Sequence, residues 1–308
     1  NQILSLVGEY SKKENANKPF IGGISHIPVT GKVVDEDDIK NLVESSLDGW
    51  FTSGHFTDKF EKKINSFLGT RHTLFVNSGS SANLIAISAL KELYDIQDGD
   101  EVITCAVGFP TTINPIIQNN LTPVLVDADI KTYNINPDLV EASITNKTKG
   151  IVLAHTLGNP FNVQKIKDIC TKYNLFLMED NCDAFGSKYN NEFTGTFGDV
   201  ATLSFYPAHH ITTGEGGAVM TNNPKLKKIM ESLRDWGRDC YCPPGEDNTC
   251  KKRFEWQLGG LPHGYDHKYI YSRIGYNLKS TDMQAALGYS QIDKLEAFII
   301  KRKENFQY

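Results

Sequence analysis

The most informative part of this sequence reads Ser204-Phe205-Tyr206-Pro207-Ala208-His209-His210-Ile211-Thr212-Thr213-Gly214-Glu215-Gly216-Gly217. Its two ends overlap apolar runs that are rich in strand-forming residues, at 200–205 and 217–220. The segment between these runs is therefore predicted to connect two β-strands.

Further apolar runs occur along the chain and alternate with helical patterns. The predicted strands are Thr73–Val76, Glu101–Cys105, Thr122–Val126, Gly150–Ala154, Asn174–Met178, Val200–Phe205 and Gly217–Met220, and the clearest helices are Ser81–Leu93, Pro137–Ser143 and Val163–Tyr173. This alternation predicts an α/β fold, with a mostly parallel sheet flanked by helices. Ligands in such folds bind beyond the carboxyl ends of the strands.

Polar residues follow two of these strands. Ser78, Gly79 and Ser80 lead into a helix, whose free N–H groups could bind an anion; a serine-rich helix cap without a ligand is the simpler alternative. Asp180 stands near the end of another strand, where its carboxylate could hold the proton of a pyridinium ring or merely cap the next turn.

Together the three segments resemble the DegT/DnrJ/EryC1/StrS family, whose members have the type I fold of pyridoxal-phosphate enzymes. The resemblance extends from about Gly54 through the segments at 273–277 and 282–286. It implies an N-terminal segment (1–27), a large cofactor-binding domain (28–285) and the start of a smaller C-terminal domain (286–308), most of which this chain would lack.

The resemblance also assigns roles to individual residues. Asp180 would contact the pyridine nitrogen, and Phe109 would stack on the ring. Asn277 would reach the phosphate bound by a neighbouring subunit, which implies a homodimer. Asp183 departs from the Gln or His that relatives often have against the ring, so its role stays open. The residues implied to hold the phosphate are Ser78, Gly79, Ser80 and Ser204.

His209 stands where aminotransferases of the family carry the lysine that anchors the cofactor. Imidazole forms no stable Schiff base, so the cofactor is predicted to be bound non-covalently, as pyridoxamine phosphate. Imidazole can still move protons near neutral pH. Two dehydratase branches of the family share this feature: those acting on GDP-4-keto-6-deoxymannose and on CDP-4-keto-6-deoxyglucose. A catalytically dead scaffold is the alternative, and the neighbouring His210 is expected to be only a neighbour.

Cysteines separate the two branches. Three of the six, Cys240, Cys242 and Cys250, lie in an irregular stretch between residues 238 and 264, and Cys182 follows Asp180 by two residues. Four thiolates suit zinc or iron. Their spacing resembles that of the CDP-sugar 3-dehydratases, which implies a 2Fe–2S cluster and an NADH-dependent flavin reductase as partner. The GDP branch resembles this chain without the four cysteines and recovers its cofactor with glutamate.

Composition limits the remaining possibilities. The chain has 308 residues, a formal net charge of -5 and a pI near 5.9, which argues against a nucleic-acid partner. Apolar runs are too short to span a bilayer, and residues 1–18 are polar. These features predict a cytoplasmic protein without a membrane partner.

Overall fold

The computed structural model describes residues 2–14, 19–27 and 33–308. The predicted boundary between residues 27 and 28 adjoins the undescribed residues 28–32. The helices are α1 (Gln2–Glu14), α2 (Glu36–Leu47), α3 (His55–Leu68), α4 (Gly79–Leu93), α5 (Pro110–Gln118), α6 (Pro137–Ala142), α7 (Val163–Tyr173), α8 (Pro224–Arg234), α9 (Asp282–Gln291) and α10 (Leu295–Phe306), with 3₁₀ turns at Thr156–Gly158 (η1), His267–Tyr269 (η2) and Ile292–Lys294 (η3).

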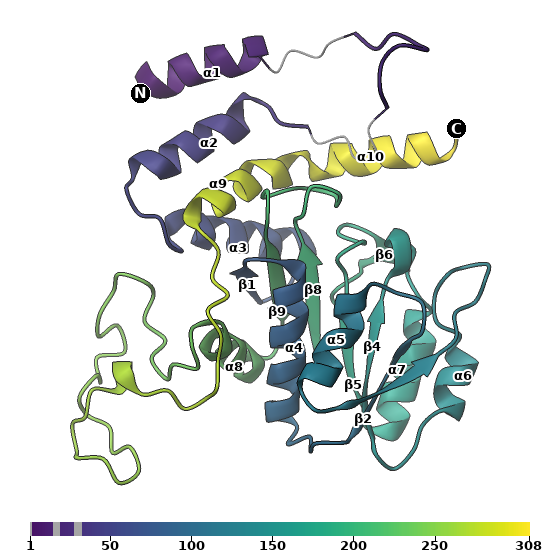
Figure 1. The fold of residues 1–308 in the computed structure, drawn as a ribbon, viewed down its shortest axis with the longest axis vertical. Helices are drawn as coiled ribbons and strands as arrows, with labels where there is room; N and C mark the ends of the chain where they lie inside the picture. The colour runs from purple at the N-terminus through teal and green to yellow at the C-terminus, as the bar shows by residue number, and fades with distance from the viewer. Residues whose placement is uncertain (1, 15–18, 28–32) are drawn as a thin grey trace.

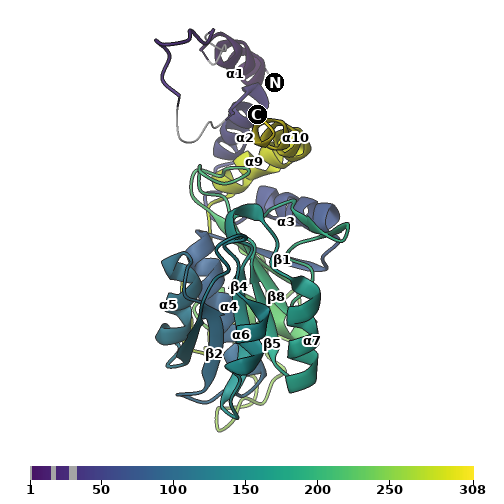
Figure 2. The ribbon, with the colours of Figure 1, turned by 90° about the vertical axis from the view of Figure 1, so that its right-hand side faces the viewer.

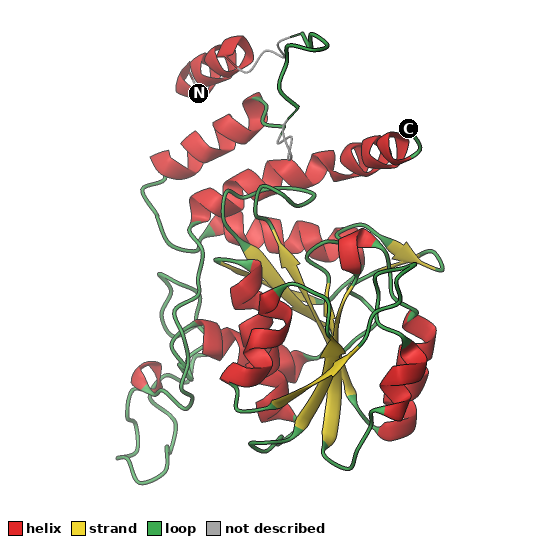
Figure 3. Ribbon diagram, turned by 45° about the vertical axis from the view of Figure 1, so that its right-hand side comes forward, coloured by secondary structure: helices red, strands yellow, loops and turns green. Residues whose placement is uncertain are grey.

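A seven-stranded sheet forms the centre of the molecule (Figure 3). Its strand order is β1-β9-β8-β5-β4-β2-β3, and only the β1–β9 and β9–β8 pairs are antiparallel. A separate two-stranded ribbon joins β6 and β7. The bounds are β1 (His72–Val76), β2 (Glu101–Cys105), β3 (Thr122–Val126), β4 (Thr148–Ala154), β5 (Phe176–Asp180), β6 (Lys188–Tyr189), β7 (Glu192–Phe193), β8 (Val200–Ser204) and β9 (Gly217–Thr221). The predicted type I, mostly parallel α/β fold is confirmed.

Helices cover both faces of this sheet (Figures 1 and 2). Side chains that alternate along each strand reach opposite faces, as the pleat requires. In β1, Leu74 and Val76 pack in the cluster that contains α4 and α8, whereas Phe75 packs with α3 and α9. In β5, Leu177 packs instead with α6 and α7. Both faces of the sheet are thus packed against apolar side chains.

The predicted strand at 174–178 was placed two residues too early. Asn174 has a left-handed backbone (φ 53°) and ends α7, and the N–H of Leu175 bonds back to the carbonyl of Cys170. Asparagine tolerates this conformation better than most residues. The strand therefore begins at Phe176, and Asp180 is its last residue.

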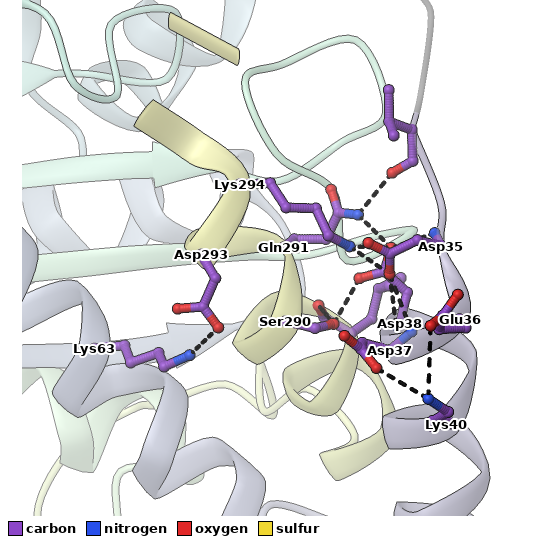
Figure 4. Close-up of polar contacts among 12 residues, drawn as sticks. Asp35, Glu36, Asp37, Asp38, Lys40, Lys63, Ser290, Gln291, Asp293 and Lys294 are labelled. Carbon is purple, nitrogen blue, oxygen red and sulfur yellow. Dashed lines mark hydrogen bonds and ion pairs between the residues drawn. The ribbon is translucent and has the colours of Figure 1, made fainter. Parts of the chain in front are cut away.

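Polar contacts join α2 to the C-terminal helices (Figure 4). Asp38 is fully buried and accepts hydrogen bonds from Ser290 Oγ (2.6 Å), Gln291 Nε2 (2.8 Å) and Lys294 Nζ (2.7 Å). Lys294 also lies 2.8 Å from Asp35, and although desolvation opposes it, this contact lowers the pKa of that carboxyl. A buried carboxylate is stable only when paired in this way, so α2 and α9 are fixed together above the sheet.

No helix among the described residues is both long and apolar enough to cross a membrane.

Candidate active site

Three segments that are distant in sequence meet at the carboxyl ends of β5 and β8. A Cβ placed on Gly79 would lie 2.6 Å from the Cβ of Ser204 and 3.1 Å from the Sγ of Cys182. Such distances leave no room for a side chain, so position 79 requires glycine. The structure therefore brings the start of α4, the end of β8 and the loop after β5 into contact, as expected for one site.

The amino end of α4 presents several hydrogen-bond donors. Ser78 caps the helix, because its Oγ accepts from the N–H of Ser81 at 3.0 Å. Ser80 is exposed and its Oγ lies 3.2 Å from Thr111 Oγ1. The first N–H groups of a helix have no partner within it, and the helix dipole favours an anion there. Ser78 thus caps α4, and the Gly79 and Ser80 end of the helix suits a phosphate.

The connection between β8 and β9, which carries His209 and His210, ends in glycines for a steric reason that Gly217 illustrates. A Cβ on Gly217 would lie 2.4 Å from the backbone of Ser78 and 2.5 Å from the N atom of Gly79. The start of β9 must therefore pass directly against the start of α4. Gly214 has φ +81°, a conformation that favours glycine.

Asp180 is buried and hydrogen-bonded on both oxygens. Its Oδ2 accepts from Asn83 Nδ2 (2.9 Å) and Thr112 Oγ1 (2.7 Å), and its Oδ1 accepts from the backbone N–H of Cys182 (3.2 Å). Two short bonds on one oxygen fix the rotation of the carboxylate. Asn83 and Thr112 were not identified as site residues from the sequence. For Asn83, the sequence feature that could have indicated a role is a polar amide within the apolar stretch of α4.

His209 lies on the turn between β8 and β9 and contacts Asp183. Its Nδ1 is 3.2 Å from Asp183 Oδ1, and this hydrogen bond lowers the pKa of Asp183 despite partial burial. The backbone of His209 is held twice: its N–H bonds to the carbonyl of Tyr206 (2.9 Å), and its carbonyl accepts from Arg302 of α10 (3.1 Å). The imidazole therefore has Nδ1 engaged, while Nε2 has no hydrogen-bond partner among the described residues.

His210 differs from its neighbour. Burial lowers the pKa of His210 to about 4, and the charge of Arg302 adds to the effect. The side chain is thus neutral at physiological pH, and its Nδ1 is buried and unpaired among the described residues.

Phe109 and Asn277, the other two residues predicted to contact the cofactor, are both exposed. Phe109 is the N-cap residue of α5, in the loop after β2, and is 70% exposed, so its ring is accessible. Asn277 is exposed and accepts from Lys279 Nζ (2.9 Å). The next residue, Leu278, accepts from the N–H of Asn77 in the same chain.

The four predicted metal ligands are not brought together. Among the described residues, no group of three or more His, Cys, Asp or Glu side chains could hold a metal ion. Cys182 lies beside Asp180, and burial raises the pKa of its thiol well above the usual range. The other three lie in the long loop after α8, where Cys242 accepts from Thr249 (3.1 Å) and Cys250 lies 3.4 Å from His267. That loop extends past α8, away from α9 and the upper ends of the strands (Figure 1). Within this loop Cys240 and Cys242 contact one another through their side chains, whereas Cys182 lies apart from them beside Asp180.

A family model for the DegT/DnrJ/EryC1/StrS aminotransferases matches residues 32–308. The chain belongs to this family. Over its full length it is 58% identical to the lipopolysaccharide biosynthesis protein RfbH of Salmonella typhimurium, of which it covers 71%. It is also 53% identical to the dTDP-4-dehydro-2,6-dideoxy-D-glucose 3-dehydratase of Saccharopolyspora spinosa, of which it covers 67%.

Solved structures of the DegT family share the fold. The E. coli GDP-4-keto-6-deoxy-D-mannose-3-dehydratase with bound hydrated PLP superimposes with a TM-score of 0.82 at 31% identity, over 92% of this chain and 71% of that one. The donors at the start of α4 and the oriented carboxylate of Asp180 suit the phosphate and the ring nitrogen of such a cofactor.

Proposed function

We propose that this chain is a sugar-nucleotide 3-dehydratase that binds pyridoxamine phosphate without a covalent bond. The observation that carries the proposal is the pairing of His209 with Asp183. The family resemblance adds that His209 stands where the aminotransferases carry their lysine. Relatives that are 3-dehydratases support the reaction class.

The binding residues are proposed as follows. The amino end of α4, with Ser78, Gly79 and Ser80, and the hydroxyl of Ser204 hold the phosphate, Phe109 stacks on the ring, and Asp180 contacts the ring nitrogen. When bound, the cofactor supplies an amine that condenses with the substrate ketone and a ring that withdraws electrons.

His209 is proposed to move the proton. Asp183 occupies Nδ1 and so orients the ring, which leaves Nε2 to take a proton from the reacting centre and to return it to the departing hydroxyl. Arg302 and Tyr206, by holding the backbone of His209, keep this nitrogen in one place. Positioning of this kind removes much of the entropic cost of proton transfer.

The finer proposal is removal of the C3 hydroxyl of CDP-4-keto-6-deoxyglucose. Its specific support is the spacing of Cys182, Cys240, Cys242 and Cys250. The similarity to a lipopolysaccharide biosynthesis protein and to a dTDP-4-dehydro-2,6-dideoxy-D-glucose 3-dehydratase adds to this support. Replacing a hydroxyl by hydrogen releases water and needs two electrons and two protons, so we propose an NADH-dependent flavin reductase as partner. The 2Fe–2S cluster, the homodimer and the cytoplasmic location stay predictions, and iron and sulfide analysis after anaerobic purification decides the first.

Product analysis tests the function. The purified protein is given pyridoxamine phosphate, the CDP- or GDP-linked 4-keto-6-deoxy sugar, and either NADH with a flavin reductase or glutamate. We expect a 3-deoxy product from the CDP sugar with the reductase. A 3-deoxy product from the GDP sugar with glutamate alone would indicate the GDP-sugar branch of the dehydratases. A 4-amino product would indicate an aminotransferase. If the protein does not bind pyridoxamine phosphate at all, the remaining interpretation is a catalytically dead scaffold.

A further inference from the structure

Asn83 is an anomaly within α4. Its side chain is 1% exposed, and it lies among the buried residues Ala82, Ile85 and Ala86. An unpaired amide in such a place would destabilise the fold. The amide is fully engaged instead, and its partners belong to the candidate active site.

The orientation of this amide follows from its partners. On one side Nδ2 faces two oxygens, Asp180 Oδ2 at 2.9 Å and the carbonyl of Thr111 at 3.0 Å. On the other side Oδ1 accepts from the hydroxyl of Thr202 at 2.7 Å. A flipped amide would set its oxygen against both of those oxygens, so only one orientation satisfies every group.

Thr112 completes the arrangement by donating from Oγ1 to the same carboxylate oxygen, at 2.7 Å. Oδ2 of Asp180 is therefore held by two donors from two helices, α4 and α5. Oδ1 receives a longer bond of 3.2 Å from the N–H of Cys182, whose thiol also hydrogen-bonds to this carboxylate. Because a carboxylate oxygen can accept more than one hydrogen bond, Oδ1 is the atom with capacity for another donor.

We propose that Asn83 and Thr112 are positioning residues that turn Asp180 so that Oδ1 meets the protonated ring nitrogen of the bound cofactor. Thr202 acts one step further away by fixing the amide of Asn83. This inference rests on the proposed function, because it requires a pyridine cofactor at Asp180. It adds residues from α4, α5 and β8 to the control of one contact that Asp180 alone was expected to make.

The test compares two ligands by calorimetry: pyridoxamine phosphate and its 1-deaza analogue, in which carbon replaces the ring nitrogen. The wild type should bind the analogue at least about 10-fold more weakly, since a hydrogen bond to a charged group is lost. In Asn83→Leu and Thr112→Val this preference should fall to near unity, while Thr112→Ser should restore it. Ser88→Ala, on the same helix but bonded to the carbonyl of Leu84, should keep the wild-type preference.

If Asn83 had a purely structural role, its replacement would lower the affinities for both ligands by the same factor. An unchanged preference in the variants would therefore overturn the inference and leave the proposed function intact. If Asn83→Leu does not fold, the Thr112 pair decides alone. A wild type that binds no pyridoxamine phosphate would instead contradict the proposed function itself.

Discussion

Nδ1 of His209 and Oδ1 of Asp183 lie 3.2 Å apart and join the turn after β8 to the loop after β5. The contact gives Asp183, whose role the sequence left open, a place beside the proposed proton carrier. It also decides which imidazole nitrogen faces the reaction, because Nδ1 is occupied.

Replacing Asp183 by Asn should slow the proton transfer by roughly 10-fold, since the ring loses its fixed orientation and its negative partner. Cofactor affinity should change little. The measurement is solvent deuterium uptake into the aminomethyl group of the cofactor in the presence of substrate. Asp168→Asn removes an equal charge from the exposed face of α7 and should have no effect; equal rates for both variants would remove Asp183 from the mechanism.

The four cysteines make a separate prediction. Serine at position 182, 240, 242 or 250 should abolish iron binding and 3-deoxy-sugar formation, yet leave the hydrogen exchange that depends on His209. Cys105 is half-buried at the end of β2 and serves as the control; Cys105→Ser should retain both properties. Stoichiometric zinc in the purified protein would show that the iron assignment is wrong.

Asn277 is predicted to complete the site of a second subunit. If so, mixing Asn277→Ala chains with chains inactivated at His209 should restore part of the activity, because one hybrid site contains neither change. Chain exchange is monitored independently by mass spectrometry of the intact dimers. Its neighbour Leu278 contacts Asn77 within the same chain, so exchange without rescue would mean that Asn277 serves its own site.

His210 should make stability depend on pH. Its folded-state pKa is about 4, below the usual 6.5, because of burial, with Arg302 and His209 opposing protonation and Asp183 favouring it. Stability from this group is therefore present above pH 6.5 and is lost as pH falls toward 4, by at most about 3 kcal/mol. Urea unfolding at pH 7 and pH 4.5 should show a smaller difference for His210→Gln than for the wild type. If the free energy of unfolding falls equally in the wild type and in His210→Gln, His210 is not the cause of the pH dependence.

Local patterns were enough to predict β2, β3 and α7 with the bounds that the structure has. Such elements follow from apolar periodicity and from residues within one segment. Contacts between segments could not be predicted in this way. The pairing of His209 with Asp183 depends on how two loops fold over adjacent strands, and the bond from Asn83 to Asp180 depends on the sheet order that places β8 beside β5. The spacing of the cysteines does not predict where the loop after α8, which carries three of them, lies relative to Cys182.

The central claim is that His209 carries the proton at a site with no covalently bound cofactor. Its most direct test is deuterium exchange at the aminomethyl carbon of bound pyridoxamine phosphate, measured with the sugar-nucleotide substrate for the wild type and for His209→Asn. We predict that the variant binds pyridoxamine phosphate with nearly wild-type affinity but shows an exchange rate lower by at least about 100-fold. Exchange at the wild-type rate in His209→Asn would contradict the account.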